Sequence, residues 1–152
     1  DRAPDARVME SILLLRVDAG LSFFNAEYFK RFVLERSRSG DREIRAVILD
    51  GMSINDLDTT AVEALTEVVE ELEKRGIQLH LTGLVGPVRD TIRYSGLYRR
   101  MGRKRFHASP HQAVLHLLRD WDRKDPEGER IEGYRESVEE DVKLSPGRSD
   151  TD

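Results

Sequence analysis

The feature that most constrains the fold is a regular alternation of short apolar segments with longer amphipathic segments. Apolar residues predict strands at 12–17, 44–50 and 77–82, and a further short strand around Phe106. Apolar residues spaced three and four apart predict helices that begin near Asn25, near Asp58, at Gly86 and at Ser109. This order predicts an α/β sandwich, in which right-handed crossovers connect a mainly parallel sheet of four to five strands with about four helices.

The charge is distributed unevenly along the chain. Residues 122–152 contain 11 acidic and 6 basic side chains, whereas residues 1–121 contain 18 and 19. The segment 122–152 also has few apolar residues, so it cannot bury enough surface to offset the entropy of ordering. We therefore expect a folded domain at 8–121 and a largely disordered, flexible acidic tail at 122–152, with at most a short helix after Tyr134.

Several classes of protein are disfavoured by composition. The chain has no cysteine, which excludes disulfides and thiolate metal sites and is compatible with a reducing compartment. No window approaches the roughly 20 apolar residues that span a bilayer. Because the sequence begins at Asp1 rather than at a methionine, we expect it to be a fragment of a longer protein.

The most informative motif is the junction at 47–65, VILDGMSINDLDTTAVEAL, where a strand passes through a polar loop into a helix. A helix start offers unpaired N–H groups and a positive dipole end, and here it carries Asp56, Asp58, Thr59 and Thr60. Asp56, Asp58 and Thr60 also spell DxDxT, the pattern of haloacid dehalogenase-like phosphatases. That chemistry requires the first aspartate directly at the strand end, beside a metal, whereas five residues separate Asp56 from Asp50. We expect a helix cap rather than a catalytic residue.

Other candidate sites are weaker. Asp50 ends a strand, as the phosphoacceptor of a response regulator does, but no acidic pair follows the first strand. The four histidines show no convincing ligand spacing, so we expect surface roles and no metal site; Ile77 to Thr82, which contains His80, alternates as a half-exposed strand would. One basic cluster is a candidate surface for a protein partner or a membrane. Its members are Arg89, Arg93, Arg99, Arg100, Arg103, Lys104 and Arg105.

Two segments together resemble the STAS domain, the module shared by bacterial anti-sigma factor antagonists and the cytoplasmic ends of SulP anion transporters. In the junction, Asp58, Thr59 and Thr60 fall on the family's aspartate followed by two hydroxyl residues. Residues 13–33, LLLRVDAGLSFFNAEYFKRFV, resemble the SulP branch through NAEYF, and GLYRRMG from Gly96 fits the end of its third helix. The resemblance covers residues 8–121.

The resemblance implies a non-catalytic regulatory or assembly domain of a SulP-type secondary anion transporter for sulfate, bicarbonate, dicarboxylate or a related anion, at the cytoplasmic face of the inner or plasma membrane. Its implied partners are the transmembrane domain of the same transporter, a second copy in a homodimer, and a cytosolic protein. We expect no cofactor and no nucleic-acid partner. Any nucleotide is expected to bind weakly at the loop around Asp58, because the cap carboxylate competes with phosphate there.

The alternative is a stand-alone partner-switch protein, similar to the anti-sigma factor antagonists. In that group the first hydroxyl residue after the aspartate is the kinase target, a position that falls on Thr59. The sequence here reads Thr-Thr-Ala rather than the usual Ser-Ser-Gly, which makes phosphorylation of Thr59 the minority hypothesis.

Overall fold

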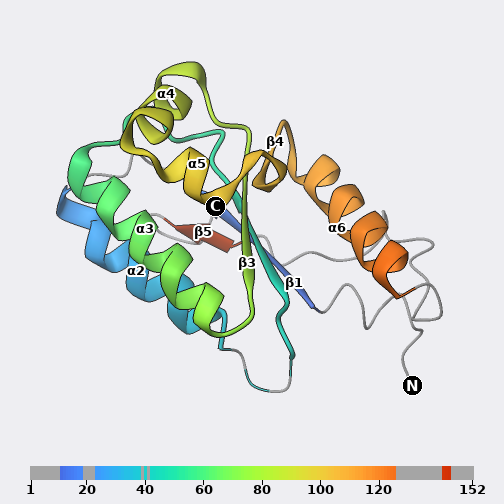
Figure 1. Cartoon of the computed structure of the whole chain (residues 1–152). Helices are drawn as coiled ribbons and strands as arrows, with labels where there is room; N and C mark the ends of the chain where they lie inside the picture. Colours follow the sequence, from blue (N-terminus) through green and yellow to red (C-terminus); the bar gives the residue numbers. More distant parts are fainter. Residues whose placement is uncertain (1–10, 19–22, 39, 41, 126–141, 145–152) are drawn as a thin grey trace.

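The computed structural model describes residues 11–18, 23–38, 40, 42–125 and 142–144, and its centre is a five-stranded parallel sheet (Figure 1). The strands are β1 (Ile12–Val17), β2 (Ala46–Asp50), β3 (Gln78–Thr82), β4 (Phe106–His107) and β5 (Val142–Leu144), in the order β4-β3-β2-β1-β5. All four pairings are parallel. The predicted α/β sandwich with a mainly parallel sheet is confirmed.

The helices divide between the two faces of the sheet (Figure 1). They are α2 (Phe23–Arg36), α3 (Thr59–Lys74), α4 (Gly86–Ser95), α5 (Leu97–Met101) and α6 (Pro110–Lys124), with a 3-10 turn at Arg103–Arg105. The larger core lies between the sheet and α2 to α5, and it includes Leu13, Leu49, Leu72 and Ile92. The smaller core lies under α6, where Leu117 and Leu118 pack with Ile12 and Ile48. Side chains of the central strands are therefore buried on both faces.

The carboxyl ends of three strands lie side by side at one end of the sheet. In open parallel sheets, ligands bind beyond these carboxyl ends. Asp50 of β2 is in register with Thr82 of β3, and Thr82 is in register with His107 of β4. The alignment continues past the strands, because the N–H of Gly51 donates to Thr82 and the N–H of Gly83 donates to His107. The loops after β2 and β3 therefore leave the sheet side by side.

Some local expectations were wrong. β3 is not half exposed: four of its five residues are buried, His80 among them, because α6 covers the face that the alternating pattern assigned to solvent. Helix α2 begins at Phe23, two residues before the predicted cap Asn25, and ends at Arg36 rather than near Ser39.

Part of the predicted tail belongs to described elements. Helix α6 continues to Lys124, and β5 pairs with β1. The helix expected just after Tyr134 falls outside the described residues, and the division of the chain at residue 121 stays a prediction. Within the described residues, no helix combines the length and the apolar composition that a bilayer crossing requires.

Candidate functional site

The junction begins at a buried carboxylate. Asp50 closes β2 and is only 6% exposed. Its Oδ1 accepts from the N–H of Met52 at 3.2 Å and from Oγ1 of Thr82 at 3.4 Å, and its Oδ2 lies 3.8 Å from Nε of Arg16. These contacts connect the ends of three strands. Asp50 therefore has a structural role in organising the strand ends.

The loop between β2 and α3 is held by its own apolar residues and by close packing. Ile54 and Leu57 are buried in the larger core, and the N–H of Ile54 donates to the carbonyl of Gly51. A Cβ on Gly51 would come within 2.6 Å of the Leu84 side chain. At Gly83, φ is +70° and a Cβ would lie 3.2 Å from Cβ of Met52, so both glycines permit the two loops to meet.

Helix α3 starts at a side-chain cap. Asp58 has an extended backbone, and its Oδ1 accepts from the N–H of Ala61 at 2.8 Å. This is the helix N-cap geometry that the sequence predicted. Thr59, the first residue of the helix, is exposed, and Thr60 is half-buried.

The DxDxT residues are not arranged as a reaction centre. Asp56 is exposed in the loop, whereas the Asp58 carboxylate is engaged with the helix start. Neither lies at the carboxyl end of a strand, where a phosphatase nucleophile would be. The junction thus presents a fixed, exposed polar surface around Asp56 and Thr59.

The basic residues do not form one uniform patch. Arg100 pairs with Glu73 of α3 at 3.0 Å, and Arg105 is half-buried near the sheet. Arg99, Arg103 and Lys104 are exposed on α5 and the 3-10 turn. Arg89 and Arg93 of α4 are also exposed, and in addition they line a cavity. Two members of the basic cluster therefore contribute to a cavity.

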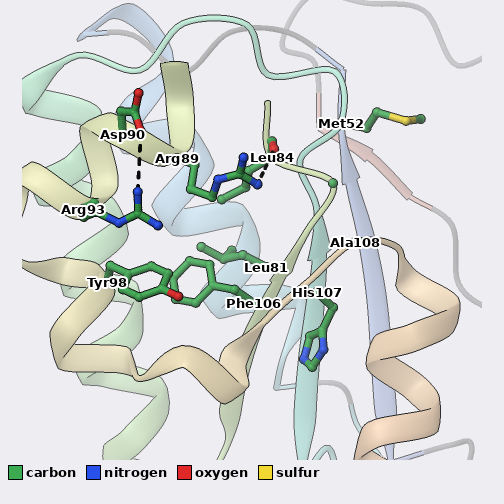
Figure 2. A pocket seen from close by; sticks show the side chains of 11 residues that line it. Met52, Leu81, Leu84, Arg89, Asp90, Arg93, Tyr98, Phe106, His107 and Ala108 are labelled. Atoms are coloured by element: carbon green, nitrogen blue, oxygen red, sulfur yellow. Dashed lines mark hydrogen bonds and ion pairs between the residues drawn. The ribbon is translucent and has the colours of Figure 1, made fainter. Parts of the chain in front are cut away.

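This cavity is an arginine–aromatic pocket of about 700 Å³ beside the junction (Figure 2). Its lining includes Met52, Leu84, Arg89, Arg93, Tyr98 and Phe106. The rings of Tyr98 and Phe106 stack with centroids 4.6 Å apart, and the Arg93 guanidinium lies 5.0 Å from the Tyr98 centroid. No local pattern in the sequence predicts this pocket, because Met52, α4 and β4 come together only in the folded chain.

Three histidines gather on the opposite face of the sheet, under α6. Nδ1 of His80 and Nε2 of His107 are 2.9 Å apart, and the His116 ring lies 5.2 Å from that of His107. Nε2 of His80 is 2.9 Å from Oε1 of Gln78. A neutral His80 can therefore donate to Gln78 and accept from the N–H of His107.

Burial lowers the pKa of two of these histidines, His80 and His107. Desolvation, with smaller contributions from the nearby charges of His107 and Arg105, lowers the pKa of His80 to about 3. Burial also lowers the pKa of His107. The expected surface role is thus wrong for His80; no group of metal-ligating side chains suited to an ion occurs in the described part of the chain. Register could have revealed the pair, since His80 and His107 point to the same face of adjacent strands.

Comparisons with known proteins agree with this architecture. The family model described as STAS domain matches residues 3–113. A probable sulfate transporter of Arabidopsis thaliana, "Probable sulfate transporter 4.2", is 32% identical over 120 residues, which cover 73% of this chain and 18% of the relative. The chain therefore spans less than a fifth of that relative's length.

Two solved structures show the same fold. The SulP transporter STAS domain from Vibrio cholerae superposes with a TM-score of 0.62 at 19% identity, over 74% of this chain and 85% of the other. A putative anti-sigma factor antagonist from Thermotoga maritima superposes with a TM-score of 0.60 at 14% identity, over 69% and 86%. The two branches named by the sequence resemblance both share the architecture, and the chain belongs to the STAS domain family.

Proposed function

We propose that this domain is the non-catalytic regulatory or assembly domain of a SulP-type secondary anion transporter. In this role the domain lies at the cytoplasmic face of the membrane, and the junction at 47–65 contacts a partner protein or another part of the same protein. Candidate substrates of the whole transporter are sulfate, bicarbonate, dicarboxylate or a related anion. The sulfate transporters among its relatives support this choice.

The observation that carries the proposal is the combination of rigidity and exposure at the junction. Asp50, Ile54, Leu57 and Asp58 fix the loop from within, while Asp56 faces solvent. A surface with a fixed backbone loses little conformational entropy on binding, which favours recognition by a partner. The first candidate partner is the transmembrane part of the same protein. The other candidates are a second copy of the domain, a cytosolic protein and a weakly bound nucleotide.

The experiment uses the full-length polypeptide that carries this chain. We expect its reading frame to contain transmembrane helices, and the purified protein to transport radiolabelled sulfate or another anion into proteoliposomes. Asp56→Lys should change the transport rate, because it reverses an exposed charge at the junction. Glu70→Lys is the matched control, since Glu70 is an exposed carboxylate in the middle of α3. A reading frame without membrane-spanning segments, or equal transport by both variants and the parent, contradicts the proposal.

The second candidate is a partner switch controlled by phosphorylation of Thr59. Exposure of Thr59 at the first position of α3 supports it, because a kinase can reach the hydroxyl there. A phosphate on Thr59 would add nearly two negative charges to the junction and repel an acidic partner. Mass spectrometry of the protein recovered from its own cells tests this candidate, and persistent absence of phosphate at Thr59 argues against it.

A further inference from the structure

The arginine–aromatic pocket joins an apolar interior to a cationic rim (Figure 2). Leu81, Leu84 and Phe106 supply apolar surface from β3, the loop after it and β4. Met52 lies at the margin of the pocket beside the junction, apart from the other lining side chains in Figure 2, and 66% of its surface is exposed. A flexible, exposed methionine adapts to differently shaped side chains and is common at surfaces that bind peptides.

Two arginines of α4 supply the cationic rim. Arg89 and Arg93 are four residues apart, so they lie on one face of the helix. Nη1 of Arg89 makes a long contact, 3.5 Å, with the carbonyl of Leu84, and Nη1 of Arg93 lies 3.7 Å from Oδ1 of Asp90. Each guanidinium has five N–H donors, so both retain the capacity to bind a carboxylate.

The surrounding charge favours an anion. Residues 86–105 contain seven basic side chains and one acidic side chain, Asp90. A partner with negative charge would therefore be attracted to this side of the domain before contact.

The arrangement of Tyr98 and Phe106 favours a ligand with an apolar side chain over a ligand with a planar base that would stack on the rings. Tyr98 already stacks on Phe106 and also contacts the Arg93 guanidinium, so the ring is engaged by its own neighbours. A bare inorganic anion, in turn, would leave the apolar surface of Leu84 and Phe106 uncovered. A carboxylate next to a large apolar side chain satisfies both parts of the pocket.

We propose that the arginine–aromatic pocket binds an acidic peptide segment of a partner protein. A carboxylate of that segment pairs with Arg89 and Arg93, and an adjacent large apolar side chain packs against Met52, Leu84 and Phe106. This proposal rests on the proposed function, in which the domain binds a partner protein. It specifies the contacts by which that partner would bind beside the junction.

The test begins with selection of displayed random heptapeptides on the 152-residue chain. We expect enriched sequences to combine Asp or Glu with a neighbouring aromatic or large aliphatic residue. A fluorescein-labelled copy of the most enriched peptide is then titrated by fluorescence anisotropy. Arg89→Gln and Arg93→Gln should each weaken binding by about tenfold or more, since each removes a charge-assisted hydrogen-bonding partner. Replacing the peptide's acidic residue by its amide should weaken binding similarly.

Arg119→Gln is the matched control, because Arg119 is exposed on α6, across the sheet from the pocket. Circular dichroism melting checks that each variant is folded. The proposal is overturned if no acidic peptide is enriched, if Arg119→Gln weakens binding as much as Arg89→Gln, or if ATP displaces the peptide at equal concentration. It is also overturned if Arg89→Gln abolishes binding to phosphatidylglycerol vesicles while peptide binding is unchanged. None of these assays measures transport, so a failure of this proposal can be distinguished from a failure of the proposed function.

Discussion

At the scale of single residues, the two aspartates of the junction have different environments. Asp58 caps α3, whereas Asp56, two residues earlier, is exposed. We expect Asp58→Ala to lower the free energy of unfolding by about 1 kcal/mol, because the N–H of Ala61 loses its acceptor. Asp56→Ala is the control and should change it by less than about 0.5 kcal/mol. Urea denaturation measures both; equal losses would show that Asp58 is not the cap that matters.

A second residue-scale prediction concerns pH. The pKa of His80 is about 3 in the folded protein, against an ordinary value of 6.5. Protonation therefore favours the unfolded chain: the stabilisation is complete above about pH 6.5 and is lost as the pH falls toward 3. Between pH 7 and pH 5 we expect a loss of about 2 kcal/mol from this residue.

The measurement is urea denaturation of the parent and of His80→Asn at both pH values. The variant should lose most of this pH dependence, whatever its stability at pH 7. His111→Asn replaces an exposed histidine on α6 and should retain it. If the parent has the same free energy of unfolding at pH 7 and pH 5, protonation of His80 does not destabilise the folded protein, and the prediction is wrong.

The residue-scale sites differ in how far the sequence could predict them. The Asp58 cap was predictable, because cap and helix are neighbours in the chain and the signal is local. The His80–His107 pair could be found only through strand register, because the two residues are 27 positions apart and no local pattern connects them. The pocket depends on an encounter between Met52, α4 and β4, for which no local pattern exists.

At the scale of elements, α6 has the largest consequence. The positions of the strands and most helix starts followed from the sequence pattern, but the burial of β3 did not, since a strand's own sequence does not show which helix will cover it. Leu117 of α6 is fully buried in the smaller core. We expect Leu117→Ala to lower the free energy of unfolding by about 2–5 kcal/mol, through lost burial and the cavity left behind.

Arg119→Ala is the control for α6, because it changes the same helix on its exposed side. Its effect should stay within about 0.5 kcal/mol. Guanidinium denaturation of the two variants compares them directly. A small effect of Leu117→Ala would mean that α6 contributes little to the stability of the sheet, and that β3 opens to solvent at low cost.

At the scale of the whole molecule, the question is which part of the chain is required for folding. The last described element, β5, pairs with three residues of β1 at the edge of the sheet. We expect a chain ending at Asp125 to unfold cooperatively, with a loss of less than about 3 kcal/mol, because a few strand hydrogen bonds contribute about 1 kcal/mol each. Amide exchange in β1 should accelerate, since its outer edge loses a partner.

A chain ending at Ala108 provides the contrast, because it lacks α6. Ile12, Ala46 and Ile48 would then face water, and each buried aliphatic side chain contributes roughly 1.5–3 kcal/mol. With typical domain stabilities of about 5–15 kcal/mol, this shorter chain should not show a cooperative thermal transition. A cooperative transition of this shorter chain would show that the sheet and α2 to α5 are stable without α6. If the chain ending at Asp125 also lacks a cooperative transition, the segment after α6 is required for folding.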